Sequence, residues 1–229
     1  MPNYYPIMLD IRNRPAIVVG GDRIAAEKAA ALRACGAHVT VMNVEFCSEL
    51  REMAERQEIT LHEKAYEPGD LAGAFVVVAT ATHDPQLAEA IWNETQQRGQ
   101  LVNIVDVPAR CSFILPSILR RGQLTISVST EGASPSLSKR IRQRLEGLFP
   151  AAYDTYMQIA VVARTYLRQQ GVSYDQRDEF FGEFFSSDIL TLLAEDNLFQ
   201  ALALTAELLQ RYGVPISTDT LTTELATVQ

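Results

Sequence analysis

The first half of the chain repeats one pattern, a short apolar run without a polar break followed by a longer stretch with helical spacing of apolar residues. The apolar runs cover residues 16–19, 39–42, 75–79 and 101–105, and the helical stretches cover residues 24–34, 48–56 and 85–97. Strands that are apolar on both faces are typical of a parallel sheet covered by helices on both sides. The pattern therefore predicts an α/β fold, a Rossmann-like doubly wound parallel sheet, in a first domain of residues 1–112.

The pattern changes after Asp106. The expected elements are strands at residues 112–119 and 124–129, a connection at 120–123 and a helix at 137–148. Ser134 is suited to cap this helix and Pro135 to its first turn. A hairpin and one helix are too small to be stable alone. Residues 113–150 are therefore expected to pack on the first domain or on another subunit.

The remainder, residues 151–229, is predicted to be an all-helical C-terminal region. Helices are expected at residues 153–169, 180–193 and 198–212, with a polar break at 171–178. The polar stretch after Pro215 is expected to fray. The aromatic group predicts core or interface packing rather than a cofactor site, and its members are Phe180, Phe181, Phe184 and Phe185.

Composition restricts the possible partners. The chain has 229 residues and a formal net charge of -8, which argues against a general nucleic-acid or acidic-membrane surface. Its apolar runs are much shorter than the roughly 20 residues of a membrane helix, and its N-terminus lacks a signal-peptide pattern. We expect a cytoplasmic protein. The spacing of Cys35, Cys47 and Cys111 matches no zinc or disulfide framework, so buried free thiols and no metal site are expected.

The first strand is followed by a candidate nucleotide loop. Its cofactor-binding candidates are Gly20, Gly21, Asp22, Arg23 and Ile24. A glycine-rich turn before a helix N-terminus is where dinucleotide folds bind a pyrophosphate. Asp22 replaces the middle glycine of the usual motif. A carboxylate about 5 Å from a phosphate charge would cost about 3 kcal/mol at an effective dielectric near 20, and Arg23 could offset this cost.

The second strand supplies further cofactor candidates, Asn43, Val44 and Glu45. An acid about 20 residues beyond the glycines commonly binds the adenosine ribose, and Glu45 is the local candidate. The choice between NAD and NADP stays open, because Arg23 could meet a 2'-phosphate whereas Glu45 would favour a free hydroxyl. A tight turn that binds no nucleotide is the alternative for the whole loop.

Motifs spread over residues 4–150 point to one family. They are Tyr5, Pro6, Ile7, Leu9, Arg14, Gly20 and Gly21, Ala81 and Thr82, and residues 103–106, 111–118 and 127–135. Together they resemble the precorrin-2 dehydrogenase family, the N-terminal part of siroheme synthases without the methyltransferase half. The resemblance is expected to cover residues 151–229 poorly. The chain departs from the family at Asp22, at His83 where relatives usually have Asp, and at Ala88 where they usually have Asn.

The resemblance implies a homodimer that oxidises precorrin-2 to sirohydrochlorin, with NAD accepting hydride. It implies that Asp106 is the catalytic acid–base residue and that Ala81 and Thr82 bind the cofactor. Asp106 would lie just beyond the carboxyl end of a parallel strand, where open α/β sheets bind ligands, although a capping role before Pro108 is the alternative. Other hypotheses are a sirohydrochlorin ferrochelatase, with ferrous iron as substrate, and a non-catalytic tetrapyrrole or nucleotide sensor.

A tetrapyrrole with eight carboxylate arms needs cations or amide donors. Seven Lys and Arg residues fall between residues 110 and 144, where Glu131 is the acidic residue. The substrate-binding candidates are Arg110, Ser112, Thr130, Ser134, Lys139 and Arg140. Thr130 stands where relatives carry Ser, and whether it is modified stays open. For the basic residues further along the helix, a solvated helix face is the alternative.

Overall fold

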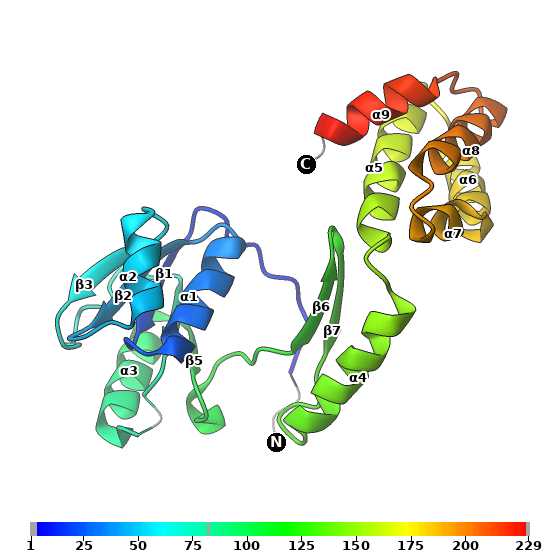
Figure 1. Ribbon diagram of the computed structural model, residues 1–229. Helices are drawn as coiled ribbons and strands as arrows, with labels where there is room; N and C mark the ends of the chain where they lie inside the picture. Colours follow the sequence, from blue (N-terminus) through cyan, green and yellow to red (C-terminus); the bar gives the residue numbers. More distant parts are fainter. Residues whose placement is uncertain (1–3, 82, 228–229) are drawn as a thin grey trace. The chain divides into compact units, whose positions relative to one another are not determined.

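The computed structural model describes residues 4–81 and 83–227. The chain divides into two compact units, with the boundary between Leu115 and Pro116. The first unit is an α/β layer structure and the second contains a hairpin and helices (Figure 1). The expected fold class is confirmed. The division into domains at residues 112 and 150 stays a prediction.

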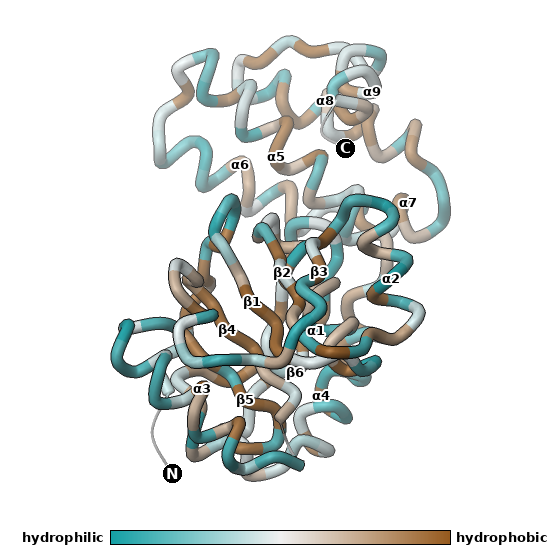
Figure 2. The backbone as a smooth tube through the Cα atoms, turned by 90° about the vertical axis from the view of Figure 1, so that its left-hand side faces the viewer, coloured by the Kyte–Doolittle hydropathy of each residue, from teal (hydrophilic) through white to brown (hydrophobic). Residues whose placement is uncertain are grey.

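A parallel five-stranded sheet forms the first unit, with strand order β3-β2-β1-β4-β5. The strands are β1 (Pro15–Val19), β2 (His38–Asn43), β3 (Thr60–Glu63), β4 (Val76–Ala79) and β5 (Leu101–Ile104). The order reverses between β1 and β4, which creates the switch point where such sheets bind ligands. The residues of β1 and β4 are mostly hydrophobic (Figure 2), as expected for strands covered on both faces.

Helices cover both faces of this sheet. They are α1 (Arg23–Ala34), α2 (Ser48–Glu55) and α3 (Pro85–Arg98). Ala25 and Ala29 of α1 share one core with Leu50 of α2 and alternate residues of β1 and β2. Ile91 of α3 belongs to a second core, with Val77 of β4 and residues of β5. The sheet is therefore doubly wound.

The crossover from β3 to β4 has no helix, and Glu94 of α3 holds this loop in place. Its carboxylate accepts hydrogen bonds from the Tyr66 hydroxyl at 2.7 Å and from the N–H groups of Gly69 and Leu71 at 2.9 and 3.2 Å. Arg98 donates a further bond at 2.9 Å. Burial opposes ionisation of Glu94, but these hydrogen bonds hold the pKa of its carboxyl below the usual value.

The second unit begins with a hairpin of β6 (Ser117–Arg121) and β7 (Leu124–Val128), followed by α4 (Pro135–Leu148). The hairpin is as predicted, but β6 includes Arg120 and Arg121, so the connection is shorter than the expected 120–123, and residues 112–116 are not a strand. The reason is that Ser112 pairs with β5 of the first unit instead of with β7, its N–H donating to the Val102 carbonyl at 2.8 Å. Ser134 caps α4 as expected and accepts a hydrogen bond from the Leu137 N–H at 3.3 Å.

The C-terminal region is helical, as predicted. Its helices are α5 (Tyr153–Gln169), α6 (Tyr174–Ser186), α7 (Ile189–Ala194), α8 (Leu198–Arg211) and α9 (Thr218–Thr227). Phe180 and Phe184 are fully buried in the core of this region, so their predicted packing role is confirmed, whereas Phe185 is 54% exposed.

Three predictions for the helices of this region were wrong. The polar break at 171–178 is shorter, because Ser173 and Gln176 form a capping box that starts α6 at once. The single expected helix at 180–193 is two helices separated at Ser187. The tail forms α9, whose Leu221 and Leu225 are buried, so tertiary packing overrides its polar composition.

Candidate functional site

The turn between β1 and α1 lies at the switch point of the sheet. A Cβ on Gly20 would lie 2.0 Å from Thr80 Oγ1, just beyond β4, and Gly20 has a φ of +145°. A Cβ on Gly21 would lie 1.8 Å from the carbonyl oxygen of Glu45. Both glycines are therefore required by the close approach of this turn to the carboxyl ends of the neighbouring strands.

Asp22 is the N-cap of α1. Its carboxylate accepts a hydrogen bond from the Ala25 N–H at 2.8 Å, and its φ of −86° is accessible to any residue. The N–H groups of Arg23 and Ile24 make no hydrogen bond to a described residue. The start of α1 thus has two N–H donors available for an anion. The third N–H, that of Ala25, is already hydrogen-bonded to the Asp22 carboxylate.

The other predicted cofactor residues surround this turn in part. Asn43 donates from Nδ2 to the Glu45 carbonyl at 2.7 Å, so the end of β2 folds back against Gly21. The side chains of Val44 and Glu45 are exposed. Ala81 is buried after β4. Thr82 lies outside the described residues.

Arg23 extends away along α1. Its Nε lies 3.7 Å from Glu27, and both side chains are largely exposed. Thr80 is a neighbour of the turn that the sequence analysis missed. Its signal was a polar residue at the end of an otherwise apolar strand, at the switch point.

Asp106 lies two residues beyond β5, at the same edge of the sheet. Its φ is +60°, a left-handed conformation that Asp and Asn tolerate better than most residues, and its side chain is exposed. The short 3₁₀ turn at Pro108–Arg110 has Val107 as its N-cap, without a side-chain cap. The alternative of a capping aspartate is therefore wrong. Among the described residues no donor is hydrogen-bonded to the Asp106 carboxylate.

The remaining candidates of the first unit already have partners. Arg110 forms an ion pair with Glu89 of α3. The Ser112 hydroxyl accepts a hydrogen bond from the Val102 N–H at 2.8 Å. Both contacts hold the segment after Asp106 against β5 and α3.

Four substrate candidates lie in the second unit. Thr130 Oγ1 accepts from the Ser134 N–H at 3.0 Å and lies 3.1 Å from Ser138 Oγ, so it supports the start of α4. Lys139 and Arg140 are exposed and have no ion-pair partner within residues 4–81 and 83–227. Arg142 of the same helix pairs with Glu146. Arg144 is exposed as well, and it too has no ion-pair partner in the described part of the chain. Lys139, Arg140 and Arg144 are thus the cations of α4 available to an anionic ligand.

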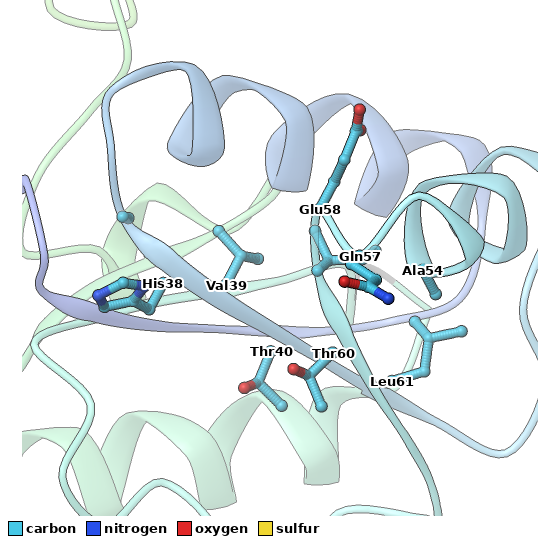
Figure 3. A pocket seen from close by; sticks show the side chains of 10 residues that line it. His38, Val39, Thr40, Ala54, Gln57, Glu58, Thr60 and Leu61 are labelled. Carbon is cyan, nitrogen blue, oxygen red and sulfur yellow. The ribbon is translucent and has the colours of Figure 1, made fainter.

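A hollow of about 500 Å³ lies elsewhere on the first unit (Figure 3). It is lined by Ala37, His38, Val39, Thr40, Ala54, Gln57, Glu58, Ile59, Thr60 and Leu61. The side chains of Thr40 and Thr60 lie next to each other in it. It borders the amino-terminal half of β2, opposite the edge where α/β sheets bind ligands.

The part of the chain that the structure describes contains neither a candidate metal cluster nor a candidate membrane helix. No cluster of three or more His, Cys, Asp or Glu residues that could hold a metal ion is found among them. None of the helices in residues 4–81 and 83–227 has the length and apolar character needed to cross a membrane. The three cysteines form no disulfide bond and are half-buried, which corrects the expectation of buried thiols.

Two family models match the chain. A model described as putative NAD(P)-binding matches residues 7–117, and one described as sirohaem biosynthesis protein central matches residues 121–148. The chain is 35% identical to the siroheme synthase of Photorhabdus laumondii over 199 residues, which are 87% of this chain and 42% of that protein. It is 36% identical to the siroheme synthase of Zymomonas mobilis over 184 residues, 80% of this chain and 39% of that protein. The chain thus spans about two fifths of the length of these relatives.

A solved structure titled "SirC, precorrin-2 dehydrogenase" superimposes on the chain with a TM-score of 0.75 and 27% identity. The match covers 92% of this chain and 99% of the other. The similarity therefore continues well into residues 151–229, and the expectation that it would cover this region poorly is wrong.

Proposed function

Because the chain belongs to the family formed by the N-terminal part of siroheme synthases, we propose that it is an NAD-dependent precorrin-2 dehydrogenase that produces sirohydrochlorin. The observation that carries the proposal is the position of Asp106. Its exposed carboxylate lies beyond β5, at the sheet edge where the β1–α1 turn also lies. An acid–base group and a nucleotide turn at one sheet edge are what a dehydrogenase requires.

Asp106 accepts the proton in this reaction. Oxidation of precorrin-2 removes one hydride and one proton from the macrocycle, and the products are sirohydrochlorin, NADH and a proton. When bound, NAD supplies the acceptor for the hydride. The carboxylate takes the proton as the new double bond forms and then releases it to water.

Three features of the candidate cofactor site favour the binding of NAD, and one feature opposes it. The N–H groups of Arg23 and Ile24 are available for a pyrophosphate, and Glu45 is available for a ribose hydroxyl. Gly20 and Gly21 keep the turn narrow. Asp22 opposes a phosphate charge, so we expect weaker NAD binding than a glycine would allow.

Lys139 and Arg140 bind carboxylates of the substrate. Both cations are exposed and lack an ion-pair partner in the described part of the chain. Arg110 would contribute only after exchanging Glu89 for a substrate carboxylate. Ser112, Thr130 and Ser134 use their hydroxyls within the protein, which favours a supporting role for them.

The chain acts as a homodimer, as the family resemblance implies. The support is apolar surface in the second unit, where Ile118, Leu137 and Leu148 are 39%, 48% and 68% exposed. Analytical ultracentrifugation tests this, because a monomer at micromolar concentration would contradict it. A cytoplasmic location stays a prediction.

The function is tested by incubating the purified protein with precorrin-2 and NAD without oxygen and following sirohydrochlorin and NADH by absorbance. Asp106→Asn should lower kcat by about 10²- to 10⁴-fold. Asn also tolerates the left-handed conformation, so the turn should persist. Asp175→Asn, which removes an exposed carboxylate from α6, is the matched control.

The outcomes separate the alternatives. No sirohydrochlorin from the wild type with either NAD or NADP would overturn the dehydrogenase proposal. Unchanged turnover by Asp106→Asn would overturn the role of Asp106 alone. Formation of siroheme from sirohydrochlorin and ferrous iron would establish the chelatase alternative, and binding of NAD without turnover would favour a sensor.

A further inference from the structure

The thiol of Cys111 lies inside the turn that carries Asp106. Its Sγ accepts from the Ile104 N–H at 3.2 Å and lies 3.3 Å from the carbonyl oxygens of both Ile104 and Val107. These two residues precede and follow Asp106 in the chain. We propose that Cys111 is a positioning residue for Asp106, an inference that rests on the proposed function.

Backbone bonds alone close the turn only partly. The Val107 N–H donates to the Ile104 carbonyl at 3.1 Å, and the Arg110 N–H donates to the Val107 carbonyl at 2.9 Å. Asp106 itself has a φ of +60°, which costs energy for a residue with a side chain. A further attachment across the turn is therefore needed to keep one conformation, and the Cys111 thiol provides it.

Cys111 is followed directly by two residues that are hydrogen-bonded to β5. Ser112 exchanges hydrogen bonds with the Val102 backbone, and Asn103 Nδ2 donates to the Phe113 carbonyl at 3.0 Å. The same amide nitrogen lies 3.7 Å from Cys111 Sγ. The position of Sγ relative to Ile104 is thus fixed by β5, so the thiol transmits the rigidity of the sheet to the turn.

The chemistry of a protonated thiol fits this place. The S–H group donates to one of the two carbonyl oxygens while the sulfur accepts from an N–H group. A thiolate would be repelled by the two carbonyl oxygens, because they carry partial negative charge. Burial raises the pKa of the Cys111 thiol, although the Ile104 N–H opposes this, so the donor is retained at neutral pH.

The test compares Cys111→Ala and Cys111→Ser with the wild type. Cys111→Ala removes the contacts of Sγ with Ile104 and Val107 and should lower kcat about tenfold to a hundredfold, with the KM for NAD unchanged, because the carboxylate is displaced. Cys111→Ser keeps a donor and an acceptor and should retain most of the activity. Cys35→Ala, which removes a half-buried thiol at the other end of α1, is the control and should match the wild type.

A double variant separates positioning from a general loss of structure. If Cys111 acts through Asp106, then Cys111→Ala should cause no further loss of kcat in Asp106→Asn. Hydrogen exchange of the Val107 amide should be faster in Cys111→Ala, with unchanged exchange in the α3 helix. This measurement needs neither cofactor nor substrate.

Each outcome decides the inference. Wild-type kcat in Cys111→Ala, or losses that multiply in the double variant, would overturn it. If Cys111→Ala does not fold, Cys111→Val replaces it, since it keeps apolar volume without the hydrogen bonds. An inactive wild type would overturn the proposed function, yet faster Val107 exchange in the Cys111 variant would still show that the thiol holds the turn.

Discussion

The Asp22 carboxylate accepts the hydrogen bond that the Ala25 N–H offers at the start of α1, at 2.8 Å. In dinucleotide folds this end of the first helix faces the cofactor pyrophosphate. A protein carboxylate and a phosphate are thereby brought to the same positive helix end. They compete for its donors, and they also repel each other.

The first prediction follows from this competition. Asp22→Asn should bind NAD about tenfold to a hundredfold more tightly than the wild type. The change removes the repulsion between the carboxylate and a phosphate, which amounts to at most about 3 kcal/mol for charges about 5 Å apart at an effective dielectric near 20. Asn is as good an N-cap as Asp, so the melting temperature should change little. Isothermal calorimetry and the fluorescence of Trp92 measure the affinity.

Asp175→Asn makes the same change of charge in α6 and should leave NAD affinity unchanged. Equal affinity of Asp22→Asn and wild type would show that the phosphate does not approach Asp22. In that case the site on α1 would need to be reassigned.

A second prediction concerns Gly21, where a Cβ would lie 1.8 Å from the carbonyl oxygen of Glu45. A backbone atom cannot move aside as a flexible side chain can. Gly21→Ala should therefore destabilise the protein by about 1–3 kcal/mol, measured by urea unfolding, and should weaken NAD binding. Gly182→Ala in α6 is the control, since its Cβ would meet no atom within 4 Å. There the same change should stabilise by up to about 1 kcal/mol. Equal effects of the two changes would contradict the prediction.

The sheet could be predicted from the sequence where its strands are covered on both faces, as in β1, β4 and β5. The strand β3 was missed because it is a short edge strand whose residues, such as Thr60 and Glu63, are polar and exposed. Helix α9 was missed for a related reason. Its sequence is polar, and the burial of Leu221 and Leu225 depends on the rest of the helical region.

In the candidate site too, some features could be predicted from the sequence and others could not. Gly20 and Gly21 were predicted from their place after a strand end, and Asp106 was predicted from the family resemblance, in agreement with its place beyond a strand. The capping bond of Asp22 depends on a backbone angle that the sequence did not specify. The contacts of Cys111 with Ile104 and Val107 depend on a loop returning to β5, and residue spacing alone did not reveal them.

A third prediction uses the buried carboxylate of Glu94. Its pKa is lowered, so its contribution to stability is present above the ordinary pKa of about 4.3 and is lost as the pH falls through the lower pKa of the folded state. Glu94→Gln should lower the free energy of unfolding by about 2–3 kcal/mol at pH 7, because a charged acceptor of four hydrogen bonds is lost. Urea unfolding at pH 7 and pH 3 measures this.

The difference between Glu94→Gln and wild type should shrink toward pH 3, where the carboxylate of the wild type begins to be protonated. Glu52→Gln, at a side chain 63% exposed, should change stability by less than about 0.5 kcal/mol at either pH. A difference that stays constant with pH would mean that the charge of Glu94 is not what holds the loop.

The fourth prediction concerns the cations of α4. Arg140→Gln should raise the KM for precorrin-2 about tenfold, since a charge-assisted hydrogen bond to a carboxylate contributes about 1.5–3 kcal/mol. The affinity for NAD should not change, because the nucleotide candidates belong to other elements. Arg168→Gln removes an exposed cation from α5 and corrects for the loss of one positive charge on an acidic protein. An increase in KM that is the same in both variants would indicate only long-range attraction, which added salt would screen. An increase confined to Arg140→Gln would instead mean that this guanidinium contacts the substrate.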